Sequence, residues 1–97
     1  MSAVPDDFAQ EVAEQFERIR DLAQHGLSAD QLHSRDAREW FRSLLRVVGE
    51  IRDECKSMER SLSDRADAER ILTPSEIAEA AKISRAALYK RRPTAEK

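Results

Sequence analysis

The sequence predicts an all-α protein, and three observations lead to this prediction. The 97 residues include only two glycines and three prolines, so few positions interrupt a helix. The chain is rich in alanine, glutamate, arginine and leucine, which favour helices. Its apolar residues recur every three or four positions, which places them on one face of a helix. We therefore expect an N-terminal helical hairpin with a long coiled-coil-like helix, followed by two short helices.

The first helix is expected to run from Pro5 to about His25. Proline suits a first helical turn, and the two aspartates that follow it complement the positive end of the helix dipole. Gly26 is expected to end this helix, and residues 28–31 (SADQ) are expected to cap one further turn. The apolar stripe of the first helix consists of Phe8, Val12, Phe16, Ile19 and Ala23.

A second capping sequence, DARE at residues 36–39, opens a much longer helix. No proline interrupts the chain from there to Pro74, and a helix over 36–71 would be about 54 Å long. Its apolar residues alternate in steps of three and four, which is the pattern of a coiled-coil seam. This seam is the predicted dimerisation surface, and it consists of Phe41, Leu44, Val48, Ile51, Cys55, Met58 and Leu62.

The seam leaves two arrangements open. Around Trp40, Leu45 and Val47 the apolar stripe is too broad for two helices, so this part is expected to pack against the first helix. The narrow part from Ile51 to Leu62 suits a homodimer, whereas a monomeric hairpin would bury the whole stripe within one chain. A glycine inside this helix, Gly49, permits either a close helix crossing or a bend.

The segment TPSEIAEAAKISRAALYKRR, residues 73–92, predicts two short helices. Its opening TPSE is a capping box with proline at the first helical position, and it starts a helix over 74–81. Lysine and isoleucine then form a tight connection, and Ser84 caps a second helix from 85 to about 92. The end of the long helix is expected to supply a third, supporting helix through Ala68, Ile71 and Leu72.

This segment, about one fifth of the chain, resembles the helix-turn-helix of bacterial regulators and of resolvase/invertase recombinases. In that family a buried alanine lies where the two helices cross, and Ala78 matches it. The S-R-x-x-L-Y-K run that opens the recognition helix is matched by residues 84–90. The sequence departs from the family at Lys82, where glycine is usual because φ is often positive, and at Arg91, where an apolar residue is frequent. The packing residues of the family are matched by Ile77, Ala81, Ile83 and Leu88.

The charge distribution agrees with an anionic partner for the C-terminal part alone. Residues 1–72 have a net charge of −5, whereas residues 73–97 have +3, and the run 82–92 contains no acid. With the resemblance, this predicts that the second short helix enters the major groove of double-stranded DNA, where Arg85 contacts a guanine edge or a phosphate. The predicted DNA-binding residues are Lys82, Ser84, Arg85, Ala86, Tyr89, Lys90, Arg91 and Arg92.

The expected organisation is a helical hairpin and dimerisation region over 1–65, a helix-turn-helix head over 66–93 and a tail over 94–97. Such a protein would bind specific DNA sequences as a dimer, as a transcriptional regulator or as an accessory factor of a plasmid, a phage or recombination. A coiled-coil adaptor whose C-terminal helices bind another protein is the alternative. Because the sequence contains no nucleophile–base pair and no phosphate loop, we do not expect an enzyme.

No cofactor or metal is expected either. Cys55 is the only cysteine, and His25 and His33 lack the spacing of a helical metal-binding pair. No apolar run is long enough to span a membrane, and the N-terminus lacks the pattern of a signal peptide. The sequence therefore favours a cytoplasmic protein without membrane contact.

Overall fold

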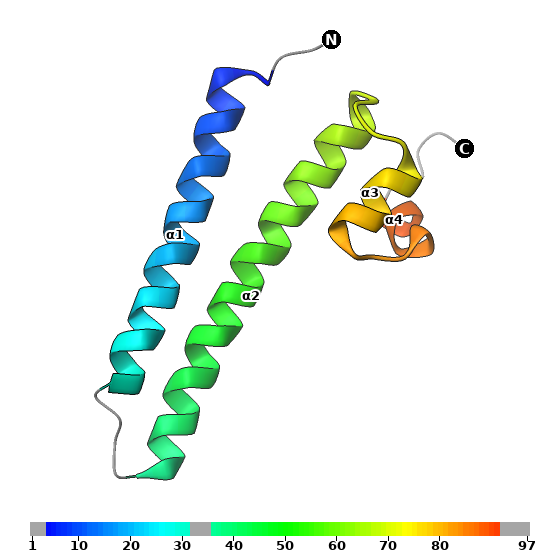
Figure 1. The fold of residues 1–97 in the computed structure, drawn as a ribbon. Helices are drawn as coiled ribbons and strands as arrows, with labels where there is room; N and C mark the ends of the chain where they lie inside the picture. The colour runs from blue at the N-terminus through cyan, green and yellow to red at the C-terminus, as the bar shows by residue number, and fades with distance from the viewer. Residues whose placement is uncertain (1–3, 32–35, 92–97) are drawn as a thin grey trace. The chain divides into compact units, whose positions relative to one another are not determined.

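The computed structural model describes residues 4–31 and 36–91, which form four α-helices and no strand (Figure 1). The all-α prediction is confirmed. The chain divides into two compact units, residues 1–58 and 59–97, whose boundary falls inside the second helix rather than between residues 65 and 66. Arg92, His33 and the tail over 94–97 lie outside the described residues. The helices are α1 (Asp6–Gln31), α2 (Ala37–Ala68), α3 (Pro74–Ala81) and α4 (Arg85–Arg91).

Helix α1 continues through Gly26 to Gln31, so the predicted stop at Gly26 and the separate turn over 28–31 were wrong. Gly26 instead permits a close approach, because a Cβ atom there would lie 3.3 Å from Cγ1 of Val47 in α2. Phe16 and Ala23 were expected on the apolar stripe of α1, but both are exposed. The buried face of α1 is centred on other residues of the helix. The residues that are covered are Phe8, Val12, Gln15, Ile19, Leu22 and Gly26.

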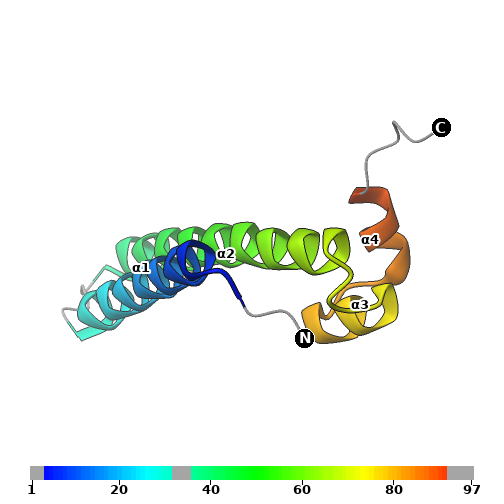
Figure 2. The ribbon, with the colours of Figure 1, turned by 90° about the horizontal axis from the view of Figure 1, so that it is seen from above.

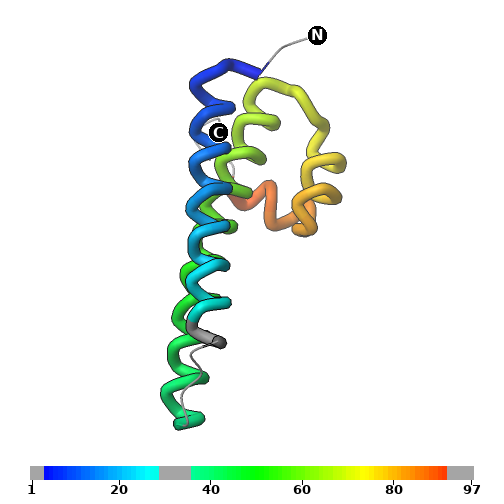
Figure 3. The backbone as a smooth tube through the Cα atoms, turned by 60° about the vertical axis from the view of Figure 1, so that its left-hand side comes forward, coloured from blue at the N-terminus to red at the C-terminus, as the bar shows by residue number. Residues whose placement is uncertain are grey.

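Within the first unit, α1 and the N-terminal part of α2 lie side by side and run in opposite directions (Figures 1 and 2). Nε of Arg18 donates a hydrogen bond to Oε2 of Glu54 at 3.3 Å, and this ion pair joins the two helices. Val47, which faces Gly26, is 7% exposed. Figure 3 shows the backbone trace of both helices from another side.

The start of α2 and its internal glycine follow simple local rules. Oδ1 of Asp36 accepts a hydrogen bond from the backbone N–H of Arg38 at 3.0 Å, so Asp36 caps the helix as predicted. Glu39, the other half of the expected capping box, pairs with Arg42 at 2.9 Å. A Cβ atom on Gly49 would meet no atom within 4 Å among the described residues, so no close crossing within the chain requires this glycine.

Helix α2 ends in a hydrogen-bonded cap whose central residue, Arg70, has a φ of 55°. The N–H of Ile71 donates to the carbonyl of Ala66 at 2.9 Å, and the N–H of Arg70 donates to that of Asp67 at 3.2 Å, the pattern of a Schellman motif. Because the helix stops at Ala68, Ile71 and Leu72 lie in the connection and are 54% and 39% exposed. The prediction that Ala68, Ile71 and Leu72 support the short helices was therefore wrong, since all three are exposed.

Candidate nucleic-acid interface

The first short helix, α3, begins with a complete capping box. Oγ1 of Thr73 accepts a hydrogen bond from the N–H of Glu76 at 3.2 Å, and Oε1 of Glu76 accepts one from the N–H of Thr73 at 2.8 Å. Pro74 occupies the first turn, where its missing N–H leaves no hydrogen bond unmade. An eight-residue helix is not stable alone in water, so these caps and its packing hold it in place.

The turn after α3 has the backbone conformation that the sequence predicts at the position usually held by glycine. Lys82 has φ 60° and ψ 44°, which is left-handed. This conformation lets the N–H of Ile83 donate to the carbonyl of Ala78 at 3.0 Å. A non-glycine residue there costs about 1–2 kcal/mol. The exposed Lys82 lies three positions before Arg85, the first residue of α4.

The contact between α3 and α4 contains the buried apolar side chains of the second unit, among the residues that the structure describes. Leu88 is 1% exposed, Ile77 is 2% exposed and Ala78 is 5% exposed. Oγ of Ser84 accepts a hydrogen bond from the N–H of Ala87 at 3.0 Å and so caps α4, as predicted. One face of α4 is thereby fixed against α3.

The opposite face of α4 is exposed and contains four of the predicted DNA-binding residues: Arg85, Ala86, Tyr89 and Lys90. Their spacing of one and four residues places them together on one side of the helix. Nη2 of Arg85 donates to Oη of Tyr89 at 3.5 Å, which aligns these two side chains along the helix. Exposed Ser84 and Lys82 continue this surface at the N-terminal end of α4.

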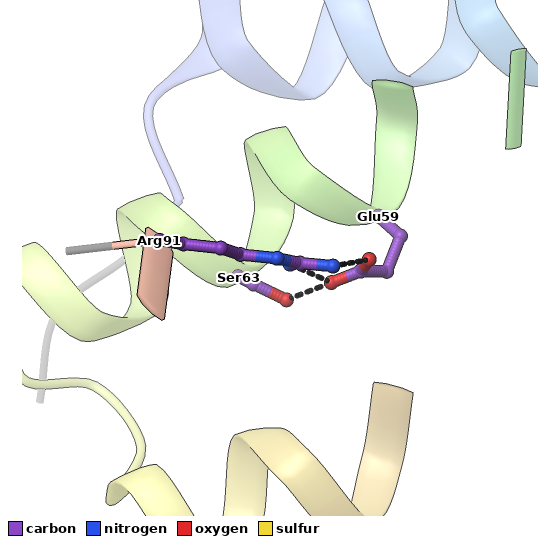
Figure 4. Close-up of polar contacts among 3 residues, drawn as sticks. All are labelled: Glu59, Ser63 and Arg91. Atoms are coloured by element: carbon purple, nitrogen blue, oxygen red, sulfur yellow. Dashed lines mark hydrogen bonds and ion pairs between the residues drawn. The ribbon is translucent and has the colours of Figure 1, made fainter. Parts of the chain in front are cut away.

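Arg91, another predicted DNA-binding residue, has a different position. Its Nη1 and Nη2 atoms donate to Oε2 and Oε1 of Glu59 at 2.8 and 2.9 Å (Figure 4). The Arg91 and Glu59 side chains are only 17% and 24% exposed, and Oγ of Ser63 donates to the same carboxylate. The guanidinium of Arg91 is thus bound to α2 instead of pointing into solvent.

The hydrogen bond from Arg91 holds the pKa of Glu59 below its ordinary value. Partial burial opposes this lowering, and the hydrogen bond from Ser63 adds to it. Neither Glu59 nor Ser63 was among the site residues predicted from the sequence. The one signal for them was Arg91 itself, since a cation where an apolar residue is frequent needs an anionic partner.

Helix α4 carries charge of one sign, because its seven residues include three basic ones and no acid. Arg85, Lys90 and Lys82 have no ion-pair partner in the described part of the chain. The carboxylate of Glu76 in α3 accepts a hydrogen bond within the capping box. The surface therefore presents cations that are available to an anionic ligand.

The residues of the predicted dimerisation seam form two rows on α2, one at least half-buried and one exposed. Leu44 and Ile51 are half-buried and Met58 is buried, whereas the other four are exposed. Leu44 and Ile51 lie on the same side of α2 as Val47, which approaches α1. The exposed row repeats every seven residues and consists of Phe41, Val48, Cys55 and Leu62.

Residues 4–31 and 36–91 contain no group of three or more His, Cys, Asp or Glu side chains that could hold a metal ion. None of the helices over these residues is long and apolar enough to cross a membrane. Comparison of the chain with protein-family models, with curated proteins and with solved structures found no match.

Proposed function

We propose that the protein binds specific sequences of double-stranded DNA as a dimer, and that the end of α2 forms a helix-turn-helix with α3 and α4. The observation that carries the proposal is the exposed, acid-free face of α4 with Arg85, Ala86, Tyr89 and Lys90. Leu88 and Arg91 anchor the other side of the same helix. A helix fixed on one side and cationic on the other has the form required for insertion into a groove.

The dimensions and side chains of α4 fit the major groove. An α-helix with its side chains is about 10–12 Å across, and the groove is about 12 Å wide. Arg85 lies in the first turn, where a recognition helix approaches base edges, and its guanidinium matches the two acceptors of guanine. Ala86 is small enough to allow close approach and suits contact with a thymine methyl group.

The remaining cations fit the phosphate backbone. Lys90 lies more than one turn after Arg85, where the walls of the groove bring phosphates close, and Lys82 precedes the helix. Two such heads in a dimer would bind two half-sites, which supports a role as a transcriptional regulator or as an accessory factor of a mobile element. In either role the residues that discriminate between sequences are on α4.

The proposal predicts different effects for the two exposed cations of α4. Arg85→Ala should weaken binding to the preferred site by about 1–3 kcal/mol and relax the preference at one base pair per half-site. Lys90→Ala should weaken binding to all duplexes alike and reduce the salt slope by about one per head. The measurement is a set of binding isotherms at several salt concentrations, on a site selected from random duplexes and on a scrambled duplex.

Arg46→Ala is the matched control, because Arg46 is an exposed cation of α2 outside this surface. It should leave both duplexes bound as in the parent protein. If Arg85→Ala and Lys90→Ala behave like this control, α4 is not a recognition helix. A parent protein that binds no duplex even at low salt would favour the adaptor, whose C-terminal helices bind a protein.

A further inference from the structure

The first unit has two faces of opposite character on either side of the contact between α1 and α2. One face is a polar groove with four acidic side chains. Each exposed residue of this groove comes directly before a residue that is buried or half-buried. Arg18, for example, precedes Ile19, and Glu50 precedes Ile51. The groove is lined by Arg18, Asp21, Leu22, His25, Glu50, Asp53 and Glu54.

The other face is apolar, and both helices contribute to it. Its residues directly follow covered ones, as Phe16 follows Gln15 and Val48 follows Val47. Because successive residues are about 100° apart around a helix, residues before and after the covered stripe lie on opposite sides of it. The apolar face therefore lies opposite the groove, and its large side chains are more than half exposed: Phe16 59%, Leu27 57%, Phe41 58%, Leu45 67% and Val48 57%.

The large side chains of this face supply a substantial part of the area of an interface. Covering its five large side chains would remove on the order of 500 Å² of apolar surface per copy. A standard protein–protein interface takes about 800 Å² from each partner. Cys55, which is exposed, follows Glu54 and extends the same face by one further position of the seven-residue repeat.

We infer that a second copy of this chain covers the face, so that two α1–α2 pairs form a four-helix bundle in which each α1 packs against α2 of the partner. Charge selects this pairing. Helix α1 contains seven acidic and two basic residues, so a contact between two α1 helices would bring two net charges of −5 together. Helix α2 contains seven of each, and its Arg38, Arg52 and Lys56 have no ion-pair partner in the described part of the chain.

A twofold axis along the helices satisfies this pairing and makes all neighbouring helices antiparallel, as in an up-down bundle. Within one chain Arg18 lies level with Glu54, and Gly26 lies level with Val47. Rotation about this axis keeps every residue at the same height along the bundle, so Glu17 lies beside Lys56 of the partner subunit. The inference refines the dimer of the proposed function, and its test contains no DNA, so either can fail without the other.

Sedimentation equilibrium of the full chain tests the occupied face. The parent should be a dimer at tens of micromolar, and Val48→Glu should raise the dissociation constant at least tenfold while keeping the helical circular dichroism. Ser57→Glu places the same charge on the same helix at an exposed position that precedes buried Met58, on the groove side. This control should remain a dimer.

A charge exchange tests the pairing of α1 with the partner's α2. Glu17→Lys and Lys56→Glu should each weaken the dimer severalfold, and the double variant should recover most of the loss. A parent protein that is monomeric at hundreds of micromolar overturns the inference. So does a Val48→Glu variant whose dissociation constant equals that of the Ser57→Glu variant. A double variant no better than the two single ones overturns the pairing of α1 with α2.

Discussion

Arg70 and Lys82 both adopt a left-handed conformation directly after a helix, with φ values of 55° and 60°. Neither has the conformational freedom of glycine, and each is a cation near the negative end of a helix dipole. The dipole interaction, about 0.3–1 kcal/mol, offsets part of the backbone cost. Lys82 is also exposed and precedes α4 in the chain. The residue thus combines an unfavourable backbone conformation with a favourable charge.

At Lys82, substitution by glycine tests the left-handed conformation. Lys82→Gly removes the left-handed strain of about 1–2 kcal/mol, but it increases the freedom of the unfolded chain by about 0.4–1 kcal/mol and gives up the dipole interaction of about 0.3–1 kcal/mol. The free energy of unfolding should stay unchanged or rise by up to about 1 kcal/mol, measured by urea denaturation. Lys90→Gly, inside α4, is the control and should lower it by about 1 kcal/mol. Equal losses for the two variants would contradict the left-handed assignment at Lys82.

Between elements, the contact of α4 with α2 through Arg91 and Glu59 is the most specific in the second unit. An apolar side chain at this position would pack with little directional preference, whereas a bidentate ion pair fixes both distance and orientation. The geometry of this pair therefore sets the end of α4, and with it the direction of the exposed face that contains Tyr89 and Lys90.

The pair also makes stability depend on pH. Because the pKa of Glu59 is lowered in the folded state, the unfolded chain binds its proton more tightly. The stabilisation is therefore complete above the unfolded-state pKa of about 4.3 and is lost as the pH falls through the folded-state value. Glu59→Gln should lower the free energy of unfolding by about 1–2 kcal/mol at pH 7, and its difference from the parent should shrink below pH 4.

Glu69→Gln is the matched control for this experiment. Glu69 pairs with Arg65 at 3.1 Å, but their side chains are 47% and 38% exposed. An exposed pair of this kind contributes about 0.5 kcal/mol or less, so the control should differ little from the parent at any pH. A Glu59→Gln deficit that stays constant from pH 7 to pH 3 would show that the ion pair is not its cause.

For the whole molecule, the two compact units predict that the second can be unfolded while the first keeps its helices. Ala78 is 5% exposed at the α3–α4 contact, so Ala78→Leu should overpack it by about 1–3 kcal/mol. Circular dichroism should show a small loss of helix, and hydrogen exchange should place the loss in α3 and α4. Ala80→Leu, at an exposed position of α3, should leave both measurements unchanged. Equal behaviour of the two variants would mean that the helix crossing lies elsewhere.

Features that depend on a few neighbouring residues could be predicted from the sequence. The capping box of Thr73 and Glu76 and the bounds of α3 are of this kind, as is the inward position of Leu88. Gly26 was misjudged because its reason lies in Val47 of another helix.

Features that depend on distant residues could not be predicted in the same way. Arg91 and Glu59 are 32 positions apart, and no local pattern joins them. The seven-residue repeat on α2 predicted one contact surface, but it did not show which row of the repeat is buried within the chain. Only the position of α1 shows which row is buried, and this position cannot be predicted from the periodicity of α2.

The ion pair between Arg91 and Glu59 also has a consequence for protein engineering. A graft of residues 73–91 onto another scaffold would carry the exposed face of α4 but leave the guanidinium without its carboxylate. The buried hydroxyl of Ser63, which donates to that carboxylate, would be missing as well. The shortest portable module therefore begins at Glu59, one helical turn before Ser63, and any chimaera joined later in the chain inherits a loosely held α4.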